Sequence, residues 1–369
     1  MSELYVGLMS GTSMDGVDAV LSDIGDSTCR VLNAHTTPFP TGLRQRLERL
    51  VTTPTPSLRD LGTLDRALGR FFAECALELM SRSAVGPKDV VAIGHHGQTV
   101  FHEPAGDEPF TMQIGDPNVV TAETGITTVA DFRRLDMALG GQGAPLVPAF
   151  HAWCFGHATE HRAVVNIGGI ANVTAIDPER PPTGFDTGPG NTLLDLWIRR
   201  CLDQPFDRDG EWSARGRVDQ RLLARMLEEP YFGARAPKST GRELFHLGWL
   251  EEQLRTAPAV EQADVQATLA ELTATTIAAA IGEAIADCRR VIVCGGGAHN
   301  RDLLRRLEQR SGIPVETTAG YGIAPDWVEG AAFGWLARAR LRTQAGNVPS
   351  VTGARRQAVL GAVYWGAPP

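Results

Sequence analysis

Glycine-rich segments that follow apolar runs are the chemically most informative feature of this sequence. Four occur, at residues 10–16, 168–169, 186–191 and 295–300. Backbone N–H groups at such turns, and at helix starts, can surround a polyphosphate. None of the four matches the GxxxxGK(S/T) loop or the full GxGxxG fingerprint. One such turn is weak evidence, because tight turns use glycine for steric reasons. Together they favour a two-lobed kinase cleft over a P-loop or dinucleotide site.

Acidic residues beside these turns could supply a base. Asp15 and Asp18 flank the first turn, and Asp186 begins the third. A kinase that acts on a weak hydroxyl or on water needs a carboxylate base, and acidic groups can organise magnesium through waters. An aspartate in a turn is more often a helix cap or an Asx-turn. Asp186 is the stronger candidate because a Gly-Pro-Gly-Asn turn follows it.

Basic and imidazole side chains offer a second kind of chemistry. Arg133 and Arg134 carry guanidinium groups that could grip a sugar carboxylate through two parallel hydrogen bonds. The local sequence alone favours a surface ion pair for them. His95 and His96 have no third ligand at useful spacing, so polar lining of a cleft, or packing, is favoured over metal binding.

The elements that must position these residues alternate between strands and helices, which favours an α/β class. Strands are expected at 4–8, 17–24, 30–36, 90–94, 163–167, 170–176 and 290–294, and helices within 42–85 and at 192–202, 265–286, 301–310 and 327–342. A strand, glycine turn and strand open both halves of the chain. This pattern fits a duplicated fold, although hairpins are common and the repeat alone leaves coincidence open.

The length and net charge of the chain limit its number of lobes and the classes of protein to which it can belong. At 369 residues the chain is expected to form two lobes, residues 1–150 and residues 151–369, with the option that the final helix returns to the first lobe. The net charge of −8 argues against binding to nucleic acid or an anionic membrane. No apolar run reaches about 18 residues, and the first residues show no basic segment of a signal peptide. Six scattered cysteines without a CxxC pair are typical of reduced thiols in a cytoplasmic protein.

Ten ordered motifs resemble the anhydro-N-acetylmuramic acid kinase family over nearly the whole chain. They are GLMSGTSMDGVDAVL (7–21), GQTVFHEP (97–104), QIGDP (113–117), VADFRRLD (129–136), GGQGAPLVPAFH (140–151), NIGGIANVT (166–174), GFDTGPGN (184–191), PKSTGRE (237–243), CGGGAHN (294–300) and PDWVEGAAFGWLA (325–337). The resemblance implies a duplicated actin/hexokinase-like, ribonuclease H-like fold with a cleft between two lobes.

The resemblance also implies a reaction, a phosphoryl transfer to an alcohol acceptor in peptidoglycan recycling. The family converts 1,6-anhydro-N-acetylmuramic acid, ATP and water to N-acetylmuramic acid 6-phosphate and ADP. Both substrates, Mg²⁺ held mainly by the ATP phosphates, a cytoplasmic location and a homodimer are expected on the same basis.

Site residues follow from the matching positions. Asp186 would be the base that draws a proton from water as the water attacks the anomeric carbon. Arg133 would bind the lactyl carboxylate, with His96 in the same sugar site, and Glu329 would contact the sugar from the second lobe. Asp18 is the candidate near magnesium. The expected ATP-binding residues are Gly11, Thr12, Ser13, Met14, Asp15, Gly16, Val17 and Asp18 in the first phosphate loop, Gly188, Gly190 and Asn191 in the second, and Gly295, Gly296, Gly297 and Asn300 in the adenosine loop.

Three departures from the family pattern leave the fine structure of the sugar site open. His95 stands where serine is common, His246 where asparagine is usual, and residues 318–322 replace a more acidic stretch. Two alternatives remain at this stage: a kinase of the same fold for another sugar, and a catalytically silent actin-like ATP-binding protein. The presence of Asp186, Arg133 and Glu329 together argues against the silent protein, which needs no water-activating base.

Overall fold

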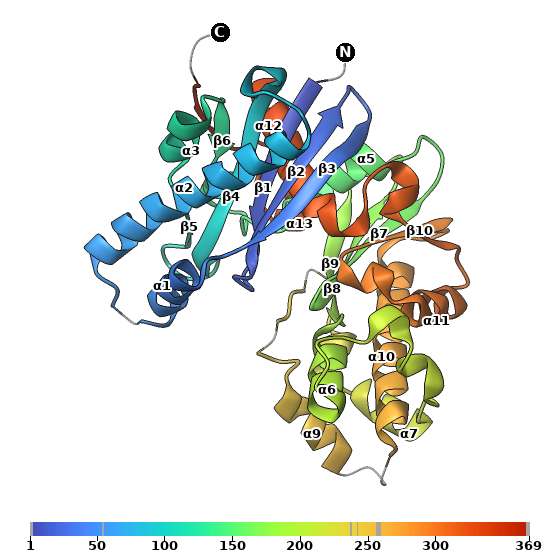
Figure 1. Ribbon diagram of the computed structural model, residues 1–369. Coiled ribbons are helices and arrows are strands. Elements are labelled where there is room, and N and C mark those ends of the chain that lie inside the picture. Colours follow the sequence, from blue (N-terminus) through green and yellow to red (C-terminus); the bar gives the residue numbers. More distant parts are fainter. Residues whose placement is uncertain (1–2, 54, 237, 242, 256–259, 367–369) are drawn as a thin grey trace. The chain divides into compact units, whose positions relative to one another are not determined.

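The chain folds into two compact units. The computed structural model describes residues 3–53, 55–236, 238–241, 243–255 and 260–366, so Pro237 and Arg242 of the PKSTGRE motif lie outside the described residues (Figure 1). Unit 1 consists of residues 1–154 and 327–369, and unit 2 of residues 155–326. The first boundary lies close to residue 150, and residues 327–369, which include the last long helix, belong to unit 1; the sequence left this return of the final helix open.

Unit 1 is built on a seven-stranded mixed sheet with the order β12-β6-β4-β1-β2-β3, and β5 pairs with β4. Strands β1, β2 and β3 form an antiparallel meander, whereas β4 runs parallel to β1 and β6 parallel to β4. The strands are β1 (Glu3–Ser10), β2 (Gly16–Ile24), β3 (Cys29–Pro38), β4 (Val90–Glu103), β5 (Phe110–Ile114), β6 (Thr128–Ala130) and β12 (Ala362–Tyr364).

Helices cover both faces of this sheet. Alternate residues of β1, such as Val6 and Leu8, join a core with α1 and α2, and Figure 1 shows the long α2 lying across the strands. The opposite face, at Gly7 and Gly94, packs against α12. The helices of unit 1 are α1 (Thr41–Thr52), α2 (Leu58–Arg82), α3 (Pro117–Thr124), α4 (Arg134–Ala138), α5 (Val147–Phe155), α12 (Val328–Leu341) and α13 (Pro349–Thr352).

The approach of α12 to the sheet explains why glycine occupies two strand positions. A Cβ atom on Gly7 would overlap the carbonyl oxygen of Gly330, and one on Gly94 would overlap that of Phe333. Only residues without a side chain let the backbones come this close. The last long helix of the chain is thereby held against the first strand.

Unit 2 repeats the same sheet plan. Its five strands have the order β11-β10-β7-β8-β9, in which β7, β8 and β9 form an antiparallel meander and β10 runs parallel to both β7 and β11. The strands are β7 (Arg162–Ile167), β8 (Ile170–Ile176), β9 (Thr183–Pro189), β10 (Arg290–Cys294) and β11 (Val315–Thr317). The common order confirms the predicted duplication.

Two apolar clusters organise unit 2. One joins the sheet to α10 and α11, and the other joins α6, α7, α9 and the first half of α10. The helices are α6 (Thr192–Leu202), α7 (Gln220–Met226), α8 (Pro230–Gly233), α9 (Leu247–Arg255), α10 (Gln262–Ala284) and α11 (Arg301–Ser311). Short 3₁₀ helices follow several loops, including Arg208–Gly210 and Gly296–His299.

Two local expectations were wrong. Residues 186–189 are not a turn but the end of β9, because Asp186 and Gly188 pair with Asn172 and Ala171 of β8 across a β-bulge. His95–Thr99 do not follow a strand but continue β4, whose Gln98 pairs with Ser10 of β1. In both cases a neighbouring strand supplies the hydrogen bonds that keep glycine-rich sequence extended.

Within the described ranges, no helix combines the length and apolar character needed to cross a membrane. The six cysteines, all of which are described, form no disulfide.

Candidate functional site

The first predicted phosphate loop is a tight turn at the end of β1. The N–H of Met14 donates to the carbonyl oxygen of Gly11 (3.2 Å), and Met14 has a φ of +55°. Thr12, Ser13 and Asp15 are exposed, so their backbone groups can reach a ligand, whereas Val17 lies in the core. Gly16 begins β2, where a Cβ atom would lie 2.9 Å from Pro38 Cα. Asp18 Oδ1 accepts a hydrogen bond from Thr36 Oγ1 (2.6 Å).

His96, Arg133 and Glu329 of unit 1 form a cluster around the Arg133 guanidinium, which we call the basic group. Arg133 donates to His96 Nε2 from Nη2 (2.8 Å) and Nε (3.1 Å), and Nη1 donates to the Gly143 carbonyl oxygen (2.8 Å). Glu329, in the first turn of α12, and buried Asp136 act electrostatically on the guanidinium. Glu329 was expected in the second lobe, but α12 carries it in unit 1. The three predicted sugar-site residues are therefore neighbours in one unit.

The hydrogen bonds of His96 and Arg133 indicate the protonation states of both side chains. Guanidinium has no acceptor, so His96 Nε2 must accept, and the ring proton lies on Nδ1, which donates to the Gly97 carbonyl oxygen (2.7 Å). Burial, and then the positive charge of Arg133, hold the pKa of His96 well below its usual value. Burial likewise lowers the pKa of Arg133 to about 10, against the opposing effect of Glu329. A neutral imidazole thus faces a charged guanidinium at neutral pH.

Buried Asp136 fixes the glycine-rich loop at residues 140–145. Its Oδ2 accepts from the Gly143 N–H (2.8 Å), and its Oδ1 accepts from Asn347 Nδ2 (2.7 Å) and Thr352 Oγ1 (2.8 Å). The Gly143 carbonyl oxygen that receives Arg133 is held by these bonds. The sequence did not single out Asp136, although it ends the VADFRRLD motif.

Asp186 lies in β9 of unit 2, three residues before the chain turns. Its Oδ2 accepts from the Thr240 N–H (3.1 Å), and its carbonyl oxygen accepts from the Tyr231 hydroxyl (2.7 Å). Burial is the main cause that raises the pKa of Asp186 to about 6; the Thr240 hydrogen bond opposes it and the charge of Glu243 adds to it. The carboxylate is therefore ionised but basic at neutral pH.

The remaining predicted ATP residues of unit 2 meet at the ends of three strands. The N–H groups of Gly190 and Asn191 donate to the carbonyl oxygens of Gly169 (2.9 Å) and Gly168 (2.8 Å). A Cβ atom on Gly295, which has a φ of +78°, would lie 2.9 Å from the Ile167 carbonyl oxygen. Gly188, with a φ of +136°, follows the β-bulge of β9, where the pairing with β8 skips Thr187. Three glycine-rich segments that are distant in sequence therefore adjoin one another.

A cavity of about 460 Å³ opens beside these segments. It is lined by Asn191, Leu194, Asp195, Phe206, Asp207, Arg208, Asp209, Gly296, His299 and Asn300. Asn191 and Asn300 also support the backbone: Asn191 Nδ2 donates to the Ile167 carbonyl oxygen (3.0 Å), and Asn300 Oδ1 accepts from the Leu303 N–H (2.9 Å). The sequence did not reveal Phe206, whose exposed ring contributes to the cavity.

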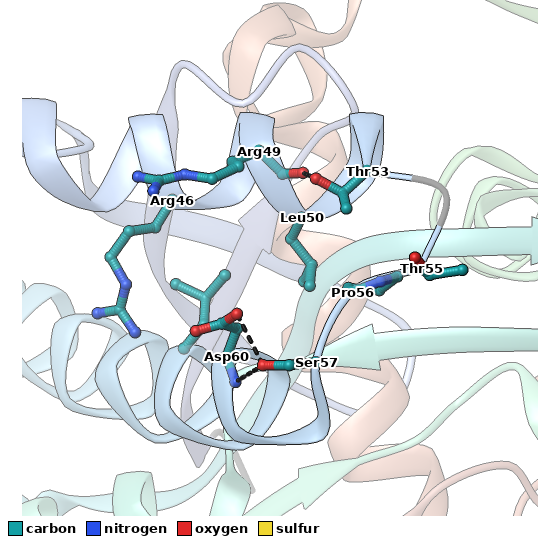
Figure 2. A pocket seen from close by; sticks show the side chains of 9 residues that line it. Arg46, Arg49, Leu50, Thr53, Thr55, Pro56, Ser57 and Asp60 are labelled. Carbon is teal, nitrogen blue, oxygen red and sulfur yellow. Dashed lines mark hydrogen bonds between the residues drawn. The ribbon is translucent and has the colours of Figure 1, made fainter.

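Unit 1 contains a cavity of similar size, about 470 Å³, where α1 ends and α2 begins. Figure 2 shows Arg46 and Arg49 of α1 on one side and the mutual hydrogen bonds of Ser57 and Asp60 on the other. Its lining consists of residues other than the predicted site residues. In the part of the chain that the structure describes, no group of three or more His, Cys, Asp or Glu side chains is arranged to hold a metal ion.

Two sheets with one strand order are the architecture of the duplicated actin/hexokinase-like fold. The sequence model of "Anhydro-N-acetylmuramic acid kinase" matches residues 3–366. The chain belongs to the anhydro-N-acetylmuramic acid kinase family.

Individual relatives support this assignment. An anhydro-N-acetylmuramic acid kinase of Coxiella burnetii (strain Dugway 5J108-111) is 49% identical over 367 residues, 99% of this chain and 98% of that protein. One of Shewanella sp. (strain ANA-3) is 48% identical over 361 residues, 97% of both chains. Among solved structures, (R)-2-hydroxyglutaryl-CoA dehydratase component A of Acidaminococcus fermentans is similar with a TM-score of 0.48 and 13% identity, covering 90% of this chain and 96% of that one.

Proposed function

We propose that this chain phosphorylates 1,6-anhydro-N-acetylmuramic acid with ATP and water, giving N-acetylmuramic acid 6-phosphate and ADP in peptidoglycan recycling. The observation that carries the proposal is the Asp186 carboxylate, whose pKa is raised to about 6. Asp186 lies in β9, three residues before the end of the strand that leads into the Gly190–Asn191 turn. A base with a pKa just below neutrality is ionised yet retains a strong affinity for a proton. Membership of the family supports the choice of substrate.

In the proposed reaction Asp186 takes a proton from water as the water oxygen bonds to C1 of the sugar. The C1–O6 bond breaks, and O6 takes the γ-phosphoryl group of ATP while the β–γ bridging bond breaks. The segments 11–16 and 188–191 are proposed to surround the phosphates. Because the N–H groups of Met14, Gly190 and Asn191 donate to carbonyl oxygens of the protein, the stabilisation of phosphate charge is assigned to the other backbone N–H groups of these segments. Residues 295–297 and Asn300 are proposed to hold the adenosine, beside the cavity that Gly296 and Asn300 line.

The basic group of unit 1 is proposed to bind the lactyl carboxylate. Three of the N–H groups of Arg133 donate to His96 and Gly143, and a guanidinium has five, so two are left for a bidentate pair with a carboxylate. His96 is only 5% exposed, so we assign it the role of orienting Arg133. Glu329 is proposed to accept a hydrogen bond from the sugar.

Magnesium is proposed to enter with the nucleotide and to neutralise charge on the phosphates. Asp18, two residues beyond the turn, is the carboxylate proposed to lie near it. A homodimer and a cytoplasmic location complete the proposal, and light scattering on the purified protein tests the dimer.

Labelled water provides the decisive test of the function. With purified enzyme, ATP, the anhydro sugar and H₂¹⁸O, mass spectrometry should find one ¹⁸O at C1 of the product and none in its phosphate. Label in the phosphate would contradict the mechanism. A panel of free and anhydro aminosugars in the same assay checks the substrate, and preference for another sugar would contradict its assignment.

A further inference from the structure

Gln98 is a fully buried polar residue that the proposed chemistry does not use. Its side chain has 0% exposure and lies in β4 where this strand pairs with the end of β1. Oε1 accepts from the Ser10 hydroxyl (2.7 Å), and Nε2 donates to the carbonyl oxygens of Gly11 (3.1 Å) and Thr99 (3.1 Å). One amide thus holds the last residue of β1 and the first residue of the turn at 11–15.

The orientation of this amide follows from its partners. If the amide were flipped, Oε1 would face two carbonyl oxygens, and both would lose their donor. In the observed orientation both amide protons and the acceptor are used. The Ser10 hydroxyl also lies 2.8 Å from the Gly16 carbonyl oxygen, at the far end of the same turn. Because the hydroxyl has one proton, it donates either to Gln98 Oε1 or to the Gly16 carbonyl oxygen, and Ser10 lies within hydrogen-bonding distance of both.

The basic group and Gln98 are joined by strand β4. His96, which accepts from Arg133, is followed by Gly97 and then by Gln98, and β4 pairs with β1 at Leu8↔His95 and Ser10↔Gln98. Gly97, between His96 and Gln98, has a φ of +75°, which glycine adopts without strain. Contacts therefore lead from Arg133 to His96, along β4 to Gln98, and from Gln98 to Ser10 and Gly11.

We propose that Gln98 is a positioning residue that fixes the Gly11–Gly16 turn for the nucleotide and couples it to occupation of the carboxylate site at Arg133. This inference rests on the proposed function, in which the turn binds phosphate and Arg133 binds the sugar. A carboxylate that orders Arg133 and His96 restrains this part of β4, and the restraint reaches the turn through Gln98. The anhydro sugar should then increase nucleotide affinity, and the nucleotide should increase sugar affinity by the same factor.

Calorimetric titration with the non-hydrolysable ATP analogue AMP-PNP, with and without anhydro-N-acetylmuramic acid, tests the coupling. The wild type should bind AMP-PNP about fivefold or more tightly when sugar is present. Gln98→Leu should reduce this ratio to about one, while its affinity for the sugar alone changes by less than about threefold. Ser10→Ala, which removes one hydroxyl group, should reduce the ratio in the same direction.

Thr124→Val is the matched control. Thr124 is 5% exposed and donates from Oγ1 to the Val120 carbonyl oxygen (2.7 Å) in α3, so this variant also loses a buried hydrogen bond of unit 1. It should keep the wild-type ratio. A wild type without coupling, an unchanged ratio in Ser10→Ala, or equal loss in Thr124→Val would overturn the role of Gln98. The labelled-water assay on the wild type judges the proposed function separately.

Discussion

The neutral ring of His96 accepts two hydrogen bonds from the guanidinium of Arg133 through a single nitrogen, Nε2, at 2.8 and 3.1 Å. This arrangement orients a half-buried cation without neutralising it. A carboxylate partner in the place of His96 would form an ion pair and compete with an anionic substrate. Imidazole fixes the direction of the guanidinium and leaves its charge available.

Replacement of Arg133 by lysine should weaken sugar binding. Lysine keeps the positive charge but cannot pair with a carboxylate through two parallel N–H groups or donate twice to His96. We expect the KM for the anhydro sugar to rise about tenfold or more, with a smaller change in the KM for ATP. Arg134→Lys is the control, since Arg134 is exposed and pairs with Asp131. Equal effects of the two substitutions in steady-state kinetics would remove the special role of Arg133.

Asp186→Asn should abolish most of the turnover. The amide cannot take the proton of the attacking water, so kcat should fall by about 10²- to 10⁴-fold, while AMP-PNP affinity stays close to wild type. Asp177→Asn, at a surface ion pair of the same unit, serves as the control for a lost carboxylate. Near-normal kcat in Asp186→Asn would exclude this residue as the base.

The pH dependence of the reaction should reflect the same carboxylate. Asp186 acts as a base only when ionised, so kcat/KM should be highest above its pKa of about 6 and fall as the pH drops below that value. Glu243 raises this pKa through its charge, so Glu243→Gln should move the acidic limb to lower pH. The shift should be small and should shrink in high salt, because Glu243 is exposed. A limb that moves to higher pH in Glu243→Gln would contradict the electrostatic cause.

Gly7→Ala should destabilise unit 1 and disturb the sugar site together. The added Cβ would lie 2.8 Å from the Gly334 nitrogen and overlap the carbonyl oxygen of Gly330, which follows Glu329. We expect a loss of about 1–3 kcal/mol, seen as a lower Tm by calorimetry, and a raised KM for the sugar. Gly62→Ala, at an open position in α2, should keep or raise the Tm. A Gly7→Ala protein as stable as wild type would show that α12 does not need this close approach.

The local sequence pattern predicted the helices and strands that depend on hydrogen bonds and apolar spacing between residues close in sequence. The strand expected at 30–36 is β3, and the helix expected at 192–202 is α6. The pattern failed where a partner strand decides the conformation, as at Asp186–Pro189, which is extended because β8 pairs with it. It also left open whether the final helix, α12, returns to unit 1, because that packing depends on glycines more than 200 residues away.

The candidate site, like the fold, could be predicted only in part from the sequence. The types of Asp186 and Arg133 suggested chemistry, whereas the family motifs supplied Glu329 and the roles of all three residues. Three contacts could not be predicted in this way: His96 orients Arg133, Asp136 holds Gly143, and Gln98 holds Gly11. These contacts depend on strand register and on the contacts of β4 with β1. Such contacts are properties of the fold and leave no periodic signal in one sequence.

The continuous segment 155–326 forms unit 2, whereas unit 1 needs both ends of the chain. During synthesis, the ribosome therefore releases every residue of unit 2 before it releases α12. Until then the face of the first sheet at Gly7 and Gly94 lacks its cover, and Glu329 is absent from the basic group. The second unit can finish folding first, although it begins later. The nascent first unit therefore leaves one face of its sheet uncovered for longer, and such transient exposure favours aggregation.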